Sequence, residues 1–219
     1  ERKDKLDISK PNFKEILMQY VFNNSNVWNL ALTYFFIYFV KASISPSLAY
    51  FLKFKGYKES LAIGVLSAFE IGGIFGNFLS GVISDKIFSG KRGIVNFIFS
   101  LGIMFSIIAF WLMPKSGYSL EFIAVTILGF FVYGPQMLVG VQVSEIVDRK
   151  AASTANGFAG TWAYVGQGIA YIVAPRIINI FGWQGYFISL IISTMIAIIF
   201  LLPTIKYEKR KNLELKSDK

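Results

Sequence analysis

Six long apolar stretches, separated by short polar or charged segments, dominate the pattern of hydrophobic and polar positions along the chain. Each holds about 20 residues or more, which is the length that an α-helix needs to cross the hydrocarbon core of a bilayer. The pattern therefore predicts an all-α membrane protein with six transmembrane helices. These spans are expected at residues 27–52, 61–83, 94–113, 122–144, 151–174 and 186–205.

Polar and basic segments flank the predicted spans. Residues 1–26 are predicted to form a cytoplasmic linker that leads into a helix along the membrane surface, and residues 206–219 to form a cytoplasmic tail. Because the sequence begins with Glu1 and shows no cleavable signal ahead of the first span, we expect it to be a piece of a longer protein.

The composition supports a membrane protein and narrows its chemistry. Of the 219 residues, 54% are hydrophobic and 16% are charged, against about 25% charged in an average soluble domain. The absence of cysteine and histidine removes disulfides, thiolate chemistry, the commonest metal ligand and the usual proton shuttle. We therefore expect no catalytic residues, no metal site and no cofactor. A membrane enzyme is the alternative, but the sequence shows no catalytic constellation for it.

The positive charges predict the topology. Sixteen of the 22 lysines and arginines lie in the amino-terminal segment, the second and fourth loops and the carboxy-terminal tail. Because cytoplasmic segments carry such an excess, both termini are predicted to be cytoplasmic, in the inner (cell) membrane of a bacterium. The net charge of +9 then follows from topology, and no nucleic-acid partner is expected.

The first span contains a single charged residue, Lys41, near its middle. A charge at that depth costs about 2.5–3.5 kcal/mol, so an acidic partner, a water-filled cavity or a bound anion must offset it. The alternative is that Lys41 extends to a lipid headgroup, but about 18 Å of helix separates it from either end of the span. Tyr34 and Tyr38 share its helical face, which we interpret as the wall of a polar cavity.

The second span also contains one charge, Glu70. It lies just before Gly72 and Gly76, which form a small-xxx-small pair. Such a pair allows the backbone of a neighbouring helix to approach closely. The second span is therefore predicted to pack tightly against another helix while it carries a carboxylate at membrane depth.

The charged loop between the second and third spans contains a distinctive pattern, formed by Gly81, Asp85, Lys86, Gly90, Lys91 and Arg92. Asp85 can bridge to a basic residue or cap the N-terminus of a neighbouring helix, so the loop can lock one conformation and release another. The alternative is an ordinary basic turn. The spacing resembles the loop signature of the major facilitator superfamily, in which the motif recurs in both halves, although the spacer between Lys86 and Gly90 is longer here.

The fourth and fifth spans carry helix-breaking or polar residues in mid-membrane. In the fourth, Gly134-Pro135 is predicted to break backbone hydrogen bonds, which survives only where the backbone lines protein or water; a packing kink is the alternative. In the fifth, small and hydrogen-bonding residues recur on one face. They suit a helix that lines a substrate path or, alternatively, one that is hydrogen-bonded to another helix. These residues are Asn156, Gly160, Tyr164, Gln167 and Tyr171.

Several stretches together resemble the organophosphate:phosphate antiporter family within that superfamily, and more narrowly its hexose-phosphate transporters and related sensor proteins. The resemblance begins near residue 27 and covers only the carboxy-terminal half of the family. It implies that the six predicted spans form one half of a major-facilitator transporter. The stretches that carry it are residues 67–73, 84–93, 111–114, 133–140 and 157–164.

The resemblance implies roles for the polar residues of the cavity. In this family a basic residue in the first helix of each half grips the substrate phosphate, and Lys41 lies at that position of the second half. An amino-terminal six-helix half would supply the other basic residue. Glu70 would be the partner of Lys41 when phosphate is absent; alternatively, it forms a salt bridge between helices with no role in transport. The sugar side would be shaped by Tyr34, Tyr38, Tyr164 and Gln167.

The implied function is the exchange of an organophosphate, foremost a sugar phosphate such as hexose 6-phosphate, for inorganic phosphate by alternating access. A glycerol-3-phosphate or phosphoglycerate antiporter and a transporter-like sugar-phosphate sensor are the alternatives. Some hexose-phosphate transporters carry acidic and basic residues in the helix that corresponds to the fifth span. This chain has neither between Ala151 and Ala174, so the sequence leaves the choice of organophosphate open.

Overall fold

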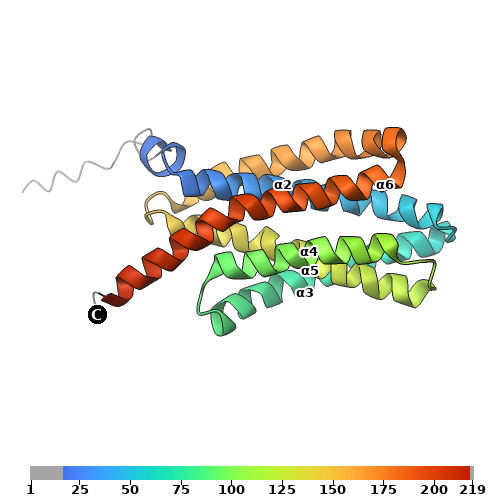
Figure 1. Cartoon of the computed structure of the whole chain (residues 1–219), viewed down its shortest axis with the longest axis horizontal. Helices are drawn as coiled ribbons and strands as arrows, with labels where there is room; N and C mark the ends of the chain where they lie inside the picture. The colour runs from blue at the N-terminus through green and yellow to red at the C-terminus, as the bar shows by residue number, and fades with distance from the viewer. Residues whose placement is uncertain (1–16, 218–219) are drawn as a thin grey trace, which may run out of the picture.

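The computed structural model describes residues 17–217, with side chains through residue 210, and nearly all of that part is helical (Figure 1). This arrangement confirms the predicted all-α fold class. The elements are the π-helical turn η1 (Leu17–Phe22), α2 (Ser25–Phe54), α3 (Glu59–Val82), the π-helical turn η2 (Ile83–Ile87), α4 (Arg92–Leu112), α5 (Tyr118–Ile146) and α6 (Ala152–Ser217).

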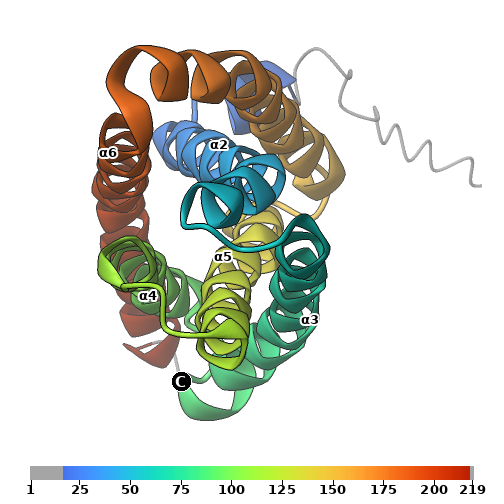
Figure 2. The ribbon, with the colours of Figure 1, turned by 90° about the vertical axis from the view of Figure 1, so that its right-hand side faces the viewer.

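Helix α6 consists of two helical arms that meet at a kink at Gly182 (Figure 2). Gly182 has φ 66° and ψ −170°, a conformation that glycine adopts without the steric cost of a side chain. The sequence predicts a loop at residues 176–185, but the chain is helical on both sides of this single residue. The connection is therefore much shorter than predicted, because one glycine is enough to redirect the chain.

Several helices extend beyond the predicted spans. Helix α2 begins at Ser25 and ends at Phe54, and α6 continues through most of the predicted tail to Ser217. Of the predicted linker and surface helix, η1 covers residues 17–22, whereas residues 1–16 lie outside the described residues. The positions at which each helix enters the bilayer stay predictions.

The helices run roughly along one axis, so the bundle has two ends. At one end lie the start of α2, the α3–α4 and α5–α6 connections and the end of α6 (Figure 1). We call it the basic end, because these segments include most of the lysines and arginines counted in the sequence. The α2–α3 and α4–α5 connections and the Gly182 kink lie at the opposite end. Helix α2 packs chiefly along α6, α3 packs along α5, and α4 contacts both α5 and α6 (Figure 2).

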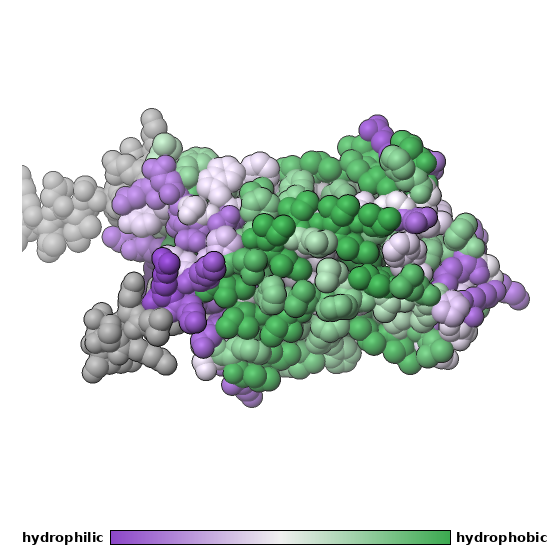
Figure 3. All heavy atoms as spheres, viewed as in Figure 1, coloured by the Kyte–Doolittle hydropathy of each residue, from purple (hydrophilic) through white to green (hydrophobic). Residues whose placement is uncertain are grey.

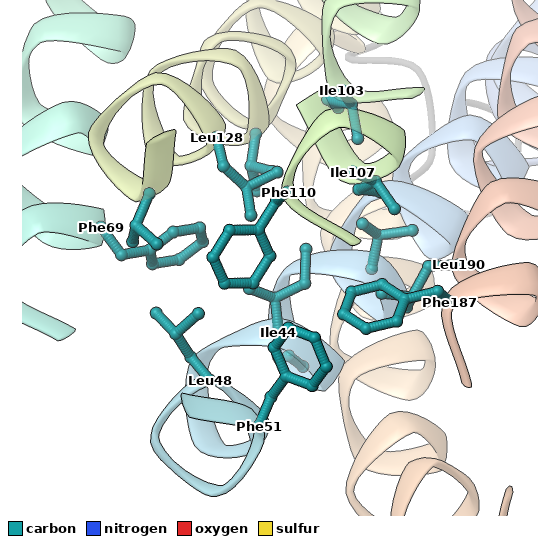
Figure 4. Packing of buried hydrophobic residues seen from close by; sticks show 14 of the residues in the cluster. Ile44, Leu48, Phe51, Phe69, Ile103, Ile107, Phe110, Leu128, Phe187 and Leu190 are labelled. Atoms are coloured by element: carbon teal, nitrogen blue, oxygen red, sulfur yellow. The ribbon is translucent and has the colours of Figure 1, made fainter. Parts of the chain in front are cut away.

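The largest apolar core lies toward the opposite end, where five helices meet (Figure 4). Its members are buried side chains that interdigitate, among them Ile44, Leu48, Phe51, Phe69, Ile103, Ile107, Phe110, Leu128, Phe187 and Leu190. Around it, a broad apolar surface separates polar residues at the two ends (Figure 3). The exposed apolar side chains include Ile74 and Phe78 on α3, at 68% each. An apolar belt of this kind is the surface that lipid covers, so the chain is an integral membrane protein.

Glycines set the distance between α3 and α5. A Cβ atom added at Gly72 or Gly76 would overlap the backbone of α5 at Thr126 or Phe130, and one added at Gly129 would overlap the backbone of Phe69. The two helices therefore pack backbone against backbone, which confirms the close approach predicted from the small-xxx-small pair.

Replacing Gly72 by alanine is expected to destabilise the fold, because the added methyl group must push the two helix backbones apart. Overpacking of this kind costs about 1–3 kcal/mol. Gly157→Ala is the matched control, since no atom lies within 4 Å of a Cβ at that position on α6. Thermal unfolding in detergent measures both variants. Equal melting temperatures for the two would contradict the close packing of α3 on α5.

Candidate functional site

Lys41 lies on α2 between two tyrosine rings. Its Nζ atom is 4.3 Å from the ring centroid of Tyr133 on α5 and 5.8 Å from that of Tyr38. Aromatic faces attract a cation within about 6 Å, more strongly where water is scarce. Within the described part of the chain, no carboxylate oxygen lies within 4.0 Å of Lys41 Nζ. Lys41 is therefore a partly buried cation that two aromatic rings stabilise and that no carboxylate of residues 17–210 contacts directly.

Glu70 lies across Tyr133 from Lys41. The Tyr133 hydroxyl donates a hydrogen bond of 2.5 Å to Glu70 Oε2. The partnership of Glu70 with Lys41 that the resemblance implies is therefore not a direct ion pair in this structure. Tyr133 occupies the position between the two charges, because its ring contacts the ammonium group while its hydroxyl satisfies the carboxylate.

A second group of polar side chains lies next to Lys41 along α2. The Tyr34 hydroxyl donates to the backbone carbonyl of Gln136 at 2.6 Å, and the Gln136 Nε2 group donates to the Tyr38 hydroxyl at 3.0 Å. The ring of Tyr38 also contacts that of Tyr164 on α6, with centroids 5.9 Å apart. Residues from α2, α5 and α6 thus form one continuous polar wall beside the lysine.

Two residues of this site, Tyr133 and Gln136, are missing from the candidates that the sequence yielded. Both flank Gly134-Pro135, the segment that the sequence predicts to be a helix break. Helix α5 remains helical across Pro135, so the predicted break is limited to the backbone hydrogen bond that proline cannot donate. Proline removes one backbone donor, and a membrane helix tolerates this loss. The feature of the sequence that could have identified the two missed residues is the pair of polar side chains, Tyr133 and Gln136, on either side of Gly134-Pro135.

The polar stripe of the first arm of α6 faces away from the helix packing. Alanines form the buried face, among them Ala155, Ala159, Ala163, Ala170 and Ala174. Tyr164 is 68% exposed and Tyr171 53% exposed, and Gln167 Nε2 donates to the Tyr171 hydroxyl at 3.1 Å. In the described residues the stripe therefore does not hydrogen-bond the first arm to another helix of this bundle.

The loop motif at the basic end is organised around Arg92. The Arg92 guanidinium pairs with Asp85 at 2.5 Å and with Glu145, at the end of α5, at 3.3 Å. Lys86 and Lys91 are exposed. Gly90 has φ +78°, and its N–H donates to the Ser84 carbonyl at 2.8 Å. The bridge between Asp85 and a basic residue that the sequence predicts is thus confirmed.

The N-terminus of α4 is capped from the far end of the chain. Glu208, near the end of α6, accepts hydrogen bonds from the backbone N–H groups of Arg92 at 2.8 Å and Gly93 at 3.0 Å. A carboxylate at this place satisfies backbone donors that have no helical partner and complements the helix dipole. The sequence assigned the capping role to Asp85 as one option, whereas the structure gives it to Glu208.

A buried ion pair lies at the opposite end of the bundle. Lys55, the residue that follows the end of α2, contacts Glu121 in the first turn of α5 at 2.6 Å, and their side chains are only 10% and 1% exposed. The Lys55 ammonium also lies over the rings of Phe51 and Phe110. No sequence pattern pointed to this pair, because its members are far apart in the sequence, near the ends of different predicted spans, and each alone looks like an ordinary interfacial charge.

Taken together, the central site presents one cation, aromatic rings and neutral hydroxyl and amide groups. It offers charge and hydrogen bonds to an anion. Glu70 supplies a nearby negative charge that Tyr133 holds in place.

The sequence matches the profile of the Major Facilitator Superfamily over residues 9–218. The chain belongs to the Major Facilitator Superfamily. The fold agrees, since the structure superposes on the xylose transporter XylE from E. coli, in a partially occluded inward-open conformation, with a TM-score of 0.68 at 20% sequence identity. That match covers 85% of this chain and 50% of the other, so this superfamily member corresponds to about half of a transporter fold.

Two curated relatives in the superfamily are named for phosphate esters. The chain is 41% identical over 193 residues to a probable hexose phosphate transport protein from Chlamydia muridarum, a match that covers 87% of this chain and 42% of the relative. It is 30% identical over 205 residues to the hexose-6-phosphate:phosphate antiporter of E. coli, covering 90% of this chain and 44% of that protein. The chain thus spans less than half the length of these relatives.

Proposed function

We propose that this chain is the carboxy-terminal half of a transporter that exchanges an organophosphate, foremost hexose 6-phosphate, for inorganic phosphate by alternating access. The observation that carries the proposal is Lys41, a cation at membrane depth with no carboxylate within 4.0 Å in the described residues. An anion is the partner that such a cation lacks. The names of the relatives support a sugar phosphate as the source of that anion.

In this proposal Lys41 binds the phosphoryl group, and a basic residue of an amino-terminal six-helix half binds it from the other side. Tyr34, Tyr38 and Tyr164 shape the wall beside it. Substrate binding neutralises the cation and so lowers the cost of closing the cavity around it. Glu70 balances Lys41 across Tyr133 when the site is empty.

The contacts around Arg92 are the part of the proposal that concerns the change between conformations during transport. We infer that the basic end is cytoplasmic, as the distribution of lysine and arginine indicates. Asp85, Glu145 and Glu208 join η2, α5 and α6 to the start of α4 there. These contacts would form in one state of the cycle and break in the other, because rocking of one half against its partner changes the spacing at this end.

A flux experiment tests the proposed function. The chain is reconstituted with its amino-terminal half into proteoliposomes loaded with radiolabelled phosphate, and glucose 6-phosphate, glycerol 3-phosphate or 3-phosphoglycerate is added outside. Efflux driven by glucose 6-phosphate is the expected result. Efflux driven only by another ester would change the substrate, and ester binding without efflux would favour a sensor. The absence of both would overturn the proposal.

Replacing Tyr133 by phenylalanine is expected to weaken phosphate binding. The ring that contacts Lys41 remains, but Glu70 loses its hydrogen-bond donor and is free to pair with the ammonium group. A partly exposed ion pair is worth up to about 1 kcal/mol, which corresponds to about a fivefold higher Kd for phosphate. Removing the competing charge in Tyr133→Phe/Glu70→Gln restores affinity. An unchanged Kd in the single variant would show that Tyr133 does not hold Glu70 away from Lys41.

A further inference from the structure

The second arm of α6 has a buried face and an exposed face. On the buried face, Ala197, Leu201 and Thr204 are fully covered by the bundle. Glu208, one turn after Thr204, continues this face to the N-terminus of α4. The exposed face, which we call the outer stripe, belongs to the apolar belt of Figure 3. Its residues are 43–60% exposed, and they are Ile192, Met195, Ile199 and Leu202.

Three cations continue the outer stripe at the basic end of the bundle. Lys206, Lys209 and Arg210 are all exposed. Because each residue of a helix turns by about 100°, they lie within about 60° of the outer stripe and at least about 100° from Glu208. Within the residues whose side chains the structure describes, no carboxylate oxygen lies within 4.0 Å of their charged groups. The apolar stripe therefore ends in positive charge that has no acidic partner there.

The three cations lie at the depth of lipid headgroups. The sixth span is predicted to end at residue 205, so residues 206–210 lie about 1.5–7.5 Å beyond it along the helix axis. The headgroup layer on each side of the hydrocarbon core is about 5–8 Å thick. A lipid whose acyl chain covers the outer stripe therefore places its phosphate beside these side chains.

The acidic residues nearby have partners of their own. Glu208 accepts hydrogen bonds from the backbone N–H groups of Arg92 and Gly93, and the Arg92 guanidinium pairs with Asp85 and Glu145. Lys91, which is exposed, directly precedes Arg92 and adds a fourth cation one residue from this contact. The carboxylates thus join α6 to α4, while the positive side chains of α6 face the surroundings.

We propose that the outer stripe and the cations Lys206, Lys209 and Arg210 form a binding site for an anionic phospholipid. Ammonium and guanidinium groups form strong, charge-assisted hydrogen bonds with phosphate oxygens. Anionic lipids attract basic segments beside a membrane-spanning helix, whereas the ammonium group of a zwitterionic lipid opposes this attraction. A soluble phosphate would leave the stripe unused. The proposal does not depend on which substrate the protein carries.

A binding experiment tests the site. The chain is purified with its amino-terminal half in a mild detergent, and saturable binding of radiolabelled phosphatidylglycerol is compared with that of phosphatidylcholine with the same acyl chains. The wild type is expected to prefer phosphatidylglycerol. In Lys206→Gln/Lys209→Gln/Arg210→Gln, its affinity is expected to fall about fivefold for each cation removed. The affinity for phosphatidylcholine is expected to stay the same.

A variant of equal charge supplies the control. Lys53→Gln/Lys58→Gln/Arg176→Gln removes three exposed cations that lie toward the opposite end, and its affinity for phosphatidylglycerol is expected to equal that of the wild type. All six positions are exposed, so both variants are expected to keep the melting temperature measured without added lipid. Equal affinity of the wild type for the two lipids would overturn the proposal. So would an unchanged affinity in the variant of the second arm, or an equal loss in both variants.

Discussion

Replacing Lys41 by alanine is expected to abolish exchange of phosphate while leaving a folded protein. Lys41 is the cation that the proposed mechanism places on the phosphoryl group, and the tyrosine rings around it offer no charge in its place. Truncating one partner of a desolvated charge pair costs about 2–5 kcal/mol, which corresponds to a loss of affinity of about 30-fold or more. Initial rates of phosphate efflux from proteoliposomes measure the effect.

Two further variants make this prediction specific. Lys41→Arg keeps the positive charge and is expected to retain exchange, although the planar guanidinium binds phosphate in a different geometry. Lys53→Ala removes a lysine whose side chain is 45% exposed and pairs with Glu59 near the end of α2, so exchange is expected to be normal. Exchange by Lys41→Ala at the rate of Lys53→Ala would remove Lys41 from the mechanism.

Replacing Glu121 by glutamine is expected to cause the largest loss of stability among single changes outside the central site. The change leaves the Lys55 ammonium in a position where it is only 10% exposed and has lost its counter-charge. Removing one partner of a buried ion pair typically costs about 3–5 kcal/mol, because the remaining charge is desolvated without compensation. Thermal unfolding of the purified protein in detergent measures the loss.

A second ion pair at the same end supplies the control. Lys53 and Glu59 are 3.2 Å apart, but their side chains are 45% and 69% exposed. Glu59→Gln is therefore expected to cost no more than about 1 kcal/mol. The double variant Lys55→Met/Glu121→Leu removes both buried charges and is expected to recover much of the stability. Equal melting temperatures for Glu121→Gln and Glu59→Gln would show that burial does not govern the pair.

The helices and the two charged residues of the candidate site could be predicted from sequence for the same physical reason. A helix that crosses the hydrocarbon core of a bilayer must consist mostly of apolar residues, so the spans can be recognised in the hydropathy pattern. Against that background Lys41 and Glu70 are conspicuous, since a charge at membrane depth is costly. The small-xxx-small pair Gly72 and Gly76 likewise predicted the close packing that α3 and α5 show.

The contacts between helices could not be predicted in this way. Tyr133 lies between Lys41 and Glu70 because of how α5 is rotated about its axis relative to α2 and α3. This rotation cannot be predicted from a single sequence. The cap that Glu208 provides joins residues 115 positions apart along the chain. The kink at Gly182 depends on one glycine among several. Each of these features is set by tertiary packing rather than by local pattern.

Equilibrium binding of radiolabelled inorganic phosphate to the purified protein, with both halves present, tests the central claim most directly. The account predicts saturable binding to the wild type, displacement of the label by glucose 6-phosphate, and loss of binding in Lys41→Ala at a normal melting temperature. Saturable binding of equal affinity in Lys41→Ala, or no saturable binding to the folded wild type, would contradict it.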